Sequence, residues 1–331
     1  MRRRDFMAGL LLVAPAVGAA RAQQSAKRHR IAIVLASGPV TRIDDPASRS
    51  WRAFWEELRR LGDVDGQNLI VERYSGEGRL EGYADLAREV VRRNPDVIVP
   101  IGPPIMQAIS AVTGTIPIVG SGAYTELGQV PNLARPGGNV TGITVSGYEI
   151  YGKRLQILKE AVPSASKVAL LDMNTGADRQ QRRDAVQKAS KVLEISLTDV
   201  LLREPTPSEY RRAFAEIAQD PPDAIIVSGI PELFPFRQSI VELVDKSRLP
   251  AMYPFRDWAE AGGLMAYGTD LVELWRRLAD DVHEVLNGAK SGDIPVYQPT
   301  MFEFLINLRA AKELGLTIPP PLLALADEVM E

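Results

Sequence analysis

The residues of this chain that could do chemistry lie in short groups just after its predicted strands. The groups combine hydroxyls, small residues and aromatic rings with few charges, a mixture suited to holding a small polar molecule reversibly. The candidate ligand-binding residues are Ser37, Gly102, Ser121, Tyr124, Asp172, Asn174, Ser228, Tyr253 and Arg256. Each loop alone is also compatible with an ordinary strand-to-helix turn, because Ser and Asp often cap helices and the tyrosines could instead fill space between two domains.

Few residues offer catalytic or metal chemistry. The chain has no cysteine, which excludes thiolate catalysis, disulfides and zinc–thiolate sites. Its two histidines are His29, in a basic stretch near the N-terminus, and His283, which has acidic neighbours. A metal site at His283 is conceivable, but the composition there favours a solvated charged helix face. The sequence also lacks a P-loop, a dinucleotide fingerprint after its first strand and a nucleophile elbow. We therefore expect no catalytic residue, no metal and no cofactor.

Length and charge set the class of protein. A chain of 331 residues is long enough for two domains, each with its own core. Its content of 45% hydrophobic and 24% charged residues is typical of soluble globular proteins. A formal net charge of −3 gives no reason to expect binding to nucleic acid or to an anionic membrane surface.

The first 22 residues have the three parts of a secretory signal peptide. Arg2, Arg3 and Arg4 form the positive region, residues 8–17 form a short apolar region, and Ala20-Arg-Ala22 is a cleavage signal. The apolar run is shorter than the ~20 residues that a membrane-spanning helix needs. The sequence from Arg3 to residue 7 also resembles a twin-arginine signal. We expect export to the periplasm and cleavage after Ala22.

The chain is organised around residues 116–146. This stretch begins with a β-branched apolar run, as in a buried strand, which opens into the small residues Gly120, Ser121 and Gly122 and the aromatic Tyr124. A strong turn signal, PGGN, follows at residues 136–139, and a second extended segment comes after it. We interpret the stretch as the place where one α/β lobe ends, presents a ligand loop and crosses to a second lobe.

Strands and helices alternate through both halves of the chain. Strands are predicted at residues 31–35, 68–74, 96–100, 116–119, 140–145, 167–171, 195–202, 224–227, 249–253 and 262–267. Helices are predicted at residues 46–61, 80–93, from 105, 149–161, 178–192, 207–219, 233–246, 271–286 and 302–314, with a last short helix after the three prolines at 319–321. This alternation predicts an α/β protein with two doubly wound parallel-sheet lobes. Ligands of such sheets bind beyond the carboxyl ends of the strands.

Several segments of this sequence are similar to those of a known family. They read FWEELRRLG at 54–62 with GQN at 66–68, RPGGNVTG at 135–142, EAGGLMAYG at 260–268, QPTMFE at 298–303 and AAKELGL at 310–316. From about Arg30 to the C-terminus the chain thereby resembles ABC-transporter periplasmic substrate-binding proteins with the type I periplasmic-binding-protein fold, related to tryptophan-binding transporter proteins.

The resemblance implies two lobes joined by a three-segment hinge that close over a solute. The crossovers are expected near residues 141–146, 265–269 and 297–302. Residues 23–142 plus 268–298 would form lobe 1, and residues 143–267 plus 299–331 would form lobe 2. The implied role is a monomeric solute-binding protein without enzyme activity, which delivers its solute to an ABC permease and its ATPase. An exported α/β enzyme, such as a hydrolase, and a receptor-coupled sensor with the same cleft are the alternatives.

Two departures from the family bear on the solute. Amino-acid-binding relatives tend to have Asp-Pro after the fourth strand, where this chain has Ala123-Tyr124, and many have Asn-Pro where it has Met173-Asn174. A tyrosine in that place favours a solute with a flat or aromatic face. We expect a small organic acid, in preference to a free amino acid, with Asp172 and Arg256 as its main charged contacts.

Overall fold

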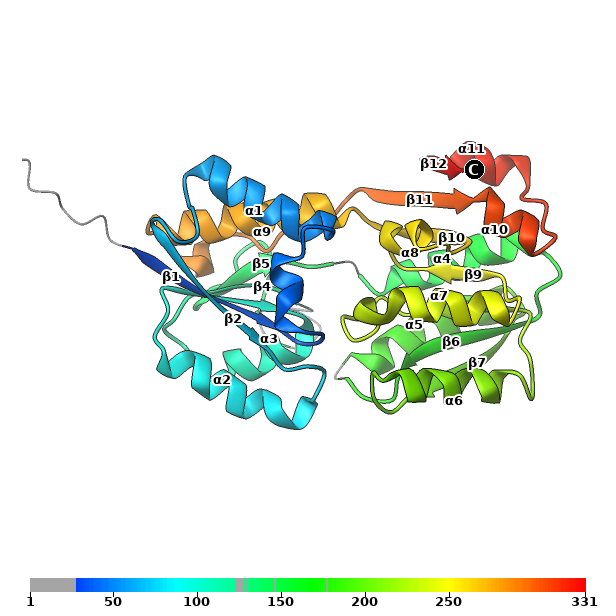
Figure 1. The fold of residues 1–331 in the computed structure, drawn as a ribbon, viewed down its shortest axis with the longest axis horizontal. Helices are drawn as coiled ribbons and strands as arrows, with labels where there is room; N and C mark the ends of the chain where they lie inside the picture. Colours follow the sequence, from blue (N-terminus) through cyan, green and yellow to red (C-terminus); the bar gives the residue numbers. More distant parts are fainter. Residues whose placement is uncertain (1–27, 123–127, 129, 146, 177) are drawn as a thin grey trace, which may run out of the picture.

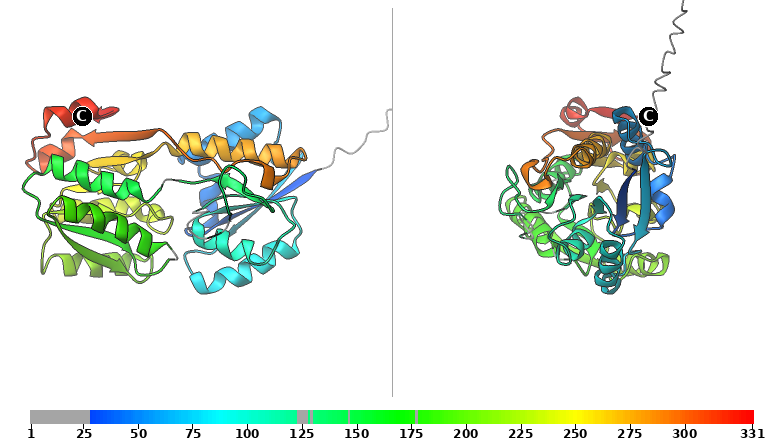
Figure 2. Two further views of the ribbon diagram at one scale, coloured as in Figure 1. Left: turned by 180° about the vertical axis from the view of Figure 1, so that it is seen from behind. Right: turned by 90° about the vertical axis from the view of Figure 1, so that its left-hand side faces the viewer.

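Apolar strands and amphipathic helices alternate along the chain and build two lobes that stand end to end (Figure 1). A computed structural model describes residues 28–122, 128, 130–145, 147–176 and 178–331. The expected signal peptide and Tyr124 lie outside the described residues. The described N-terminal strand belongs to the first lobe and the C-terminus to the second (Figure 2).

The first lobe is built on a parallel sheet of five described strands in the order β2-β1-β3-β4-β5. The strands are β1 (His29–Leu35), β2 (Leu69–Ser75), β3 (Val97–Ile101), β4 (Ile118–Ser121) and β5 (Val140–Ile143). Helices α1 (Arg49–Leu61) and α9 (Leu271–Leu286) cover one face of the sheet, and α2 (Tyr83–Arg92) and α3 (Pro103–Ser110) cover the other. In β1, Ile31 and Ile33 face the first helix pair while Ala32 and Val34 face the second, as the two-residue period of a strand requires.

The second lobe has a larger sheet of seven described strands in the order β12-β11-β10-β9-β8-β6-β7. Its strands are β6 (Lys167–Met173), β7 (Ser196–Leu202), β8 (Ala224–Val227), β9 (Ala251–Tyr253), β10 (Met265–Thr269), β11 (Phe302–Asn307) and β12 (Glu328–Met330). Its helices are α4 (Glu149–Ala161), α5 (Arg179–Val192), α6 (Pro207–Ile217), α7 (Arg237–Lys246), α8 (Arg256–Glu260), α10 (Leu308–Glu313) and α11 (Pro320–Leu325). Strands β10 and β11 are antiparallel, and the other described pairs are parallel. The fold class is therefore the predicted α/β class with two doubly wound sheets.

One predicted element is wrong. The sequence at 302–314 was expected to be a single helix, but residues 302–307 form β11 and only 308–313 are helical. The reason is pairing: β11 lies antiparallel to β10, and Phe304, Leu305 and Ile306 are buried in the sheet. Tertiary burial overrides a local pattern that is ambiguous for a short apolar run.

The chain passes between the two sheets along three segments. The first leaves β5 at Ile143 for α4, the second joins β10 to α9, and the third leads from Tyr297 to β11. The first and third run side by side, because Thr144 N–H donates to the Tyr297 carbonyl at 2.9 Å. The Thr269 hydroxyl donates to the Val145 carbonyl at 2.8 Å and ties the second segment to the first. These hydrogen bonds place all three segments together as a hinge.

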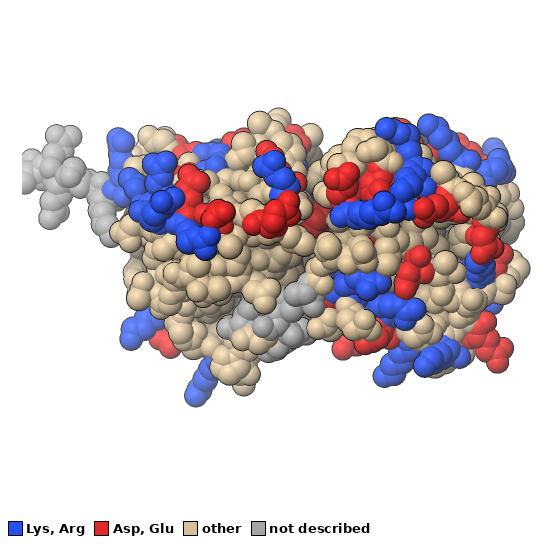
Figure 3. All heavy atoms as spheres, turned by 90° about the horizontal axis from the view of Figure 1, so that it is seen from below, with Lys and Arg blue, Asp and Glu red and all other residues tan. Residues whose placement is uncertain are grey.

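Two further observations concern the surface. No helix within the described ranges has the length and apolar character needed to cross a membrane. On the face drawn in Figure 3, basic and acidic side chains are interspersed over both lobes and no large area has one sign of charge. That face therefore offers no extended electrostatic footprint for a polyanion.

Candidate ligand-binding cleft

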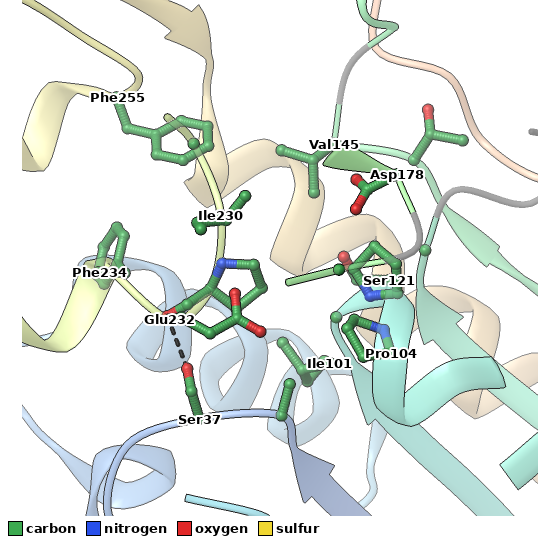
Figure 4. A pocket seen from close by; sticks show the side chains of 18 of the residues that line it. Ser37, Ile101, Pro104, Ser121, Val145, Asp178, Ile230, Glu232, Phe234 and Phe255 are labelled. Atoms are coloured by element: carbon green, nitrogen blue, oxygen red, sulfur yellow. Dashed lines mark hydrogen bonds between the residues drawn. The ribbon is translucent and has the colours of Figure 1, made fainter. Parts of the chain in front are cut away.

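A cavity of about 170 Å³ lies where the carboxyl ends of the strands of the two lobes face each other. A single buried water needs roughly 10–15 Å³, so the space suits a small solute. First-lobe loops after β1, β3 and β4 and second-lobe loops after β6, β8 and β9 line it. Figure 4 shows residues of both lobes converging on this space. The position agrees with the general rule for open α/β sheets.

The first-lobe wall contains three of the predicted residues. Ser37, Gly102 and Ser121 all line the cavity, at the ends of β1, β3 and β4. Gly102 has φ of 113° and begins the turn into α3, a conformation that favours glycine. The first two residues of α3 are prolines, which have no N–H to offer a ligand. The polar side chains that this wall presents include the buried hydroxyls of Ser37 and Ser121 and the guanidinium of Arg42.

The lobes are closed around the cavity. The Ser37 hydroxyl donates a hydrogen bond of 2.7 Å to the carbonyl of Pro231 in the other lobe. Around it, first-lobe glycines lie directly against second-lobe prolines. A Cβ built on Gly38, Gly78 or Gly102 would lie 2.9, 2.9 or 3.1 Å from the Cγ of Pro235, Pro205 or Pro231 respectively. A side chain at any of these glycines would press the lobes apart.

The second-lobe wall is held by a buried ion-pair cluster. Arg182, near the start of α5, makes two contacts with Asp172, Nε to Oδ2 at 3.0 Å and Nη2 to Oδ1 at 3.2 Å, and one with Asp178 at 2.6 Å. Burial opposes the charge of Arg182, but the carboxylates outweigh it and raise its pKa. Arg182 and Asp178 line the cavity, whereas Asp172 lies behind them. Asp172 therefore does not line the cleft, and it acts there by holding the side chain of Arg182 in place.

Glu232 differs from the other acidic residues of the wall. It follows β8, lines the cavity and is only 8% exposed, and Figure 4 shows its side chain projecting into the space. Apart from its own backbone amide, its carboxyl group has no hydrogen-bond or ion-pair partner in the described part of the chain. Burial raises the pKa of Glu232 to about 7, against the opposing effects of its backbone amide and Arg182.

Two further arginines line the cavity without an ion-pair partner among the described residues. Arg154 is 1% exposed and donates to the carbonyls of Tyr267 at 2.8 Å and Pro254 at 3.0 Å. Arg42 lies over the Phe234 ring, 5.2 Å from its centroid. Burial, and then repulsion from a neighbouring arginine, lower the pKa of Arg42 to about 10. Both guanidinium groups would be stabilised by a negatively charged ligand.

Aromatic rings complete the lining. They are Trp51, Tyr148, Tyr151, Phe234, Phe255 and Trp275. Trp51 and Trp275, from α1 and α9, meet edge to face with centroids 6.1 Å apart. The Tyr151 hydroxyl accepts from the Gly229 N–H at 3.1 Å, which fixes the loop that carries Glu232. Rings in fixed positions offer large flat contacts to a solute at low entropic cost.

The remaining predicted residues lie outside the cavity. Asn174 is exposed beside it, and Ser228 is fully buried just before the lining residue Gly229. Tyr253 stacks on Trp258 in the core, with centroids 5.5 Å apart, because the last residue of β9 faces the sheet surface and not its edge. Arg256 points away from the cavity, where its guanidinium pairs with Glu303 and Glu328.

The sequence pattern indicated most of the right loops but missed several lining residues. Arg182 and Glu232 lie ten and four positions beyond Asp172 and Ser228, the residues predicted in the same loops. The Asp178–Arg182 spacing of four residues at the start of a helix was a usable signal. Arg154 gave no such signal, since only the fold brings α4 to the cleft, and Arg42 lies five positions beyond the predicted Ser37 in the loop after β1.

The chain is similar to known proteins over most of its length. Residues 43–330 match the family model for ABC transporter substrate binding proteins. A tyrosine-binding protein from Clostridioides difficile is 25% identical over 283 residues, which cover 83% of this chain and 79% of the relative. A conserved domain protein from Vibrio cholerae has a similar structure, with a TM-score of 0.81 at 24% identity over 92% of this chain and 100% of its own. An ABC domain from Streptococcus pneumonia, in complex with L-tryptophan, has a TM-score of 0.80 at 20% identity with the same coverage.

Proposed function

Because the chain belongs to the family of ABC transporter substrate binding proteins, we propose that it captures one small organic solute between its lobes and delivers it to an ABC permease and the associated ATPase. The observation that supports this role most strongly is the cavity at the facing strand ends, lined by both lobes. A solute that contacts both walls stabilises the closed arrangement over the open one, which is how two-lobed binding proteins signal occupancy.

The lining favours a solute with a flat or aromatic part and a charged head group. The aromatic residues supply the apolar walls, while Arg42 and Arg154 favour a carboxylate. Two similar proteins are named with solutes of this chemical kind: one is a tyrosine-binding protein, and the other is an ABC domain in complex with L-tryptophan. We propose an organic acid or an amino-acid-like solute with such a face.

The described lining offers no residues for histidine-based, thiolate or metal-assisted catalysis. None of the described lining residues is a histidine or cysteine. His283 lies away from the cavity, on α9, with its ring 2.7 Å from Asp63. No group of three or more potential metal ligands occurs among the described residues. The role we propose is therefore binding without turnover.

We further propose that the chain works in the periplasm as a monomer. The sequence of residues 1–22, with its cleavage signal, supports the periplasmic location. N-terminal sequencing of exported material should begin at Gln23, and a chain that retains Met1 would contradict export. The lobe boundaries at 142–143, 267–268 and 298–299 are part of the same proposal.

Thermal denaturation with a panel of organic acids, amino acids and sugars tests the proposed function. A solute that binds the folded protein at ~100 times its Kd stabilises it by about 2.7 kcal/mol. We expect a shift with flat acids or amino acids and recovery of the solute unchanged. A chemically altered solute would show an enzyme, and a panel without any shift would contradict solute binding of this class.

A further inference from the structure

Glu232 lines the cavity, and its carboxyl group has no ion-pair partner among the described residues. The described acidic residues that line the cavity are Asp178 and Glu232, and only Asp178 has an ion-pair partner, Arg182. Glu232 is more than nine-tenths buried, yet its carboxyl group forms no ion pair in the described part of the molecule, although Arg182 is close enough to oppose the rise of its pKa. A buried carboxylate without a partner is costly, so the group either stays protonated or receives a partner from outside the chain.

The charges around Glu232 favour a cation. The titratable and charged groups that act on it, or on which it acts, are Asp172 on β6, Asp178 and Arg182 at the start of α5, Tyr83 on α2 and Tyr210 on α6. One guanidinium thus faces three carboxyl groups. Because Arg182 is already matched by Asp172 and Asp178, ionised Glu232 makes this side of the cavity negative.

The other charges of the lining have the opposite sign. Arg42 and Arg154 lack an ion-pair partner among the described residues, so the cavity as a whole presents an unmatched anion and unmatched cations. A solute that carries both a protonated amino group and a carboxylate satisfies these groups together. A plain carboxylic acid would satisfy the arginines and leave Glu232 unmatched.

We propose that Glu232 is a specificity-determining residue whose carboxylate binds a protonated amino group of the solute from the second lobe. This inference rests on the proposed solute-binding function and narrows it to amino compounds. It replaces the sequence-based expectation that an organic acid is preferred. The loop that carries Glu232 also carries Pro231, which accepts the Ser37 hydrogen bond, so closure and recognition of the amino group involve the same segment.

Matched pairs of probes test this proposal. The pairs are L-tyrosine with hydroxyphenylpropionate and L-tryptophan with indolepropionate, which differ only in the amino group. The wild-type protein should bind one of the amino acids at least about tenfold more tightly than its deamino partner, as expected for a charge-assisted contact. Equal affinity for both members of the bound pair would overturn the role of Glu232 and leave the proposed function intact. Binding of no member would contradict the aromatic solute class and overturn this proposal with it.

A variant and its control assign the effect to this residue. Glu232→Gln keeps the size of the side chain and removes the charge, and should lower the affinity for the amino acid about tenfold or more while barely changing that for the deamino partner. Glu242→Gln, on the exposed side of α7, should bind both probes as the wild type does. Wild-type affinity for the amino acid in Glu232→Gln would overturn the proposal.

Calorimetry on the wild-type protein gives a readout that does not depend on a variant. Near pH 7, Glu232 is partly protonated in the free protein, so binding an ammonium group should release protons. Titrations in two buffers of different ionisation enthalpy measure that release. Release with the amino acid is the expected result, and proton uptake or no exchange would overturn the inference.

Discussion

Ser37 and Pro231 lie 194 positions apart in the sequence, yet the hydroxyl of one donates a 2.7 Å hydrogen bond to the carbonyl of the other across the cleft. This contact joins a first-lobe strand end to the second-lobe loop that carries Glu232. Because Ser37 and Pro231 belong to different lobes, separation of the lobes would break this contact. It therefore connects the position of the lobes to the recognition of the solute.

Ser37→Ala should weaken solute binding without destabilising the solute-free fold. The substitution removes one hydrogen bond and leaves the Pro231 carbonyl unpaired in the closed state, at a cost of about 0.5–1.5 kcal/mol, or roughly two- to tenfold in Kd. In the open state water can satisfy the same carbonyl. Isothermal titration and urea unfolding measure the two effects. Ser247→Ala, on an exposed helix end, is the control, and equal affinities for both variants would contradict this role of Ser37.

Gly102→Ala should hinder closure. Its added Cβ would lie 3.1 Å from Pro231 Cγ and 3.0 Å from Ala36 Cβ, and its φ of 113° is unfavourable for alanine. Gly62→Ala is a matched control, since Gly62 has φ of 96° but nothing within 4 Å of an added Cβ. Both variants should lose about 1 kcal/mol of stability. Only Gly102→Ala should lose affinity and show a larger radius of gyration at saturating solute by X-ray scattering; identical behaviour of the two would refute the closure contact.

The stability of the solute-free protein should depend on the protonation of Glu232. Its pKa is raised from 4.5 in the unfolded chain to about 7 in the fold, so the folded state holds a proton that the unfolded state loses first. Stability is therefore highest below about pH 4.5 for this group and falls as the pH rises to about 7. The free energy of unfolding of Glu232→Gln, relative to that of the wild type, should rise by on the order of 2–3 kcal/mol between these two pH values. Urea unfolding across this pH range measures the difference; a constant difference would show that Glu232 does not titrate there.

Asp172→Asn should destabilise the second lobe strongly, although Asp172 does not line the cavity. It leaves Arg182 buried with one fewer carboxylate, and breaking such a buried pair costs about 3–5 kcal/mol. Asp199→Asn is the control, because Asp199 pairs with the same helix through Arg183 at a more exposed site and surface pairs contribute about 0–1 kcal/mol. Equal losses in thermal unfolding would mean that the Asp172–Arg182 pair is not a buried support of the cleft.

The sequence predicted the architecture because local pattern and fold agree over most elements. The first-lobe residues Ser37, Gly102 and Ser121 line the cavity, since a residue at or directly after the end of a parallel strand lies at the carboxyl edge of the sheet. The same rule was insufficient for Tyr253 and Arg256. Tyr253 is the last residue of its strand, and its side chain packs on the sheet face; Arg256 begins a helix that turns its side chain towards Glu303.

The unpaired charges of the cleft could not be predicted from the sequence. Whether a carboxylate is paired depends on side chains from distant elements, as Asp172 and Glu232 show. Asp172 is neutralised by Arg182 from the next helix, whereas Glu232 has no partner in the described chain. Nothing in the local sequence of either residue distinguishes these two states. Tyr124 alone favours an organic acid, whereas the unpaired carboxyl group of Glu232 favours an amino compound.

Mass spectrometry tests the solute-binding role of the cleft most directly. The purified protein is incubated with the solute panel and the intact complex is measured under native conditions. The bound solute is then released by denaturation and identified by its mass. We predict one solute per chain, a flat amino compound, recovered with its mass unchanged. A protein that retains no member of the panel, or that returns a solute of altered mass, would contradict the assignment of this cleft as a solute-binding site.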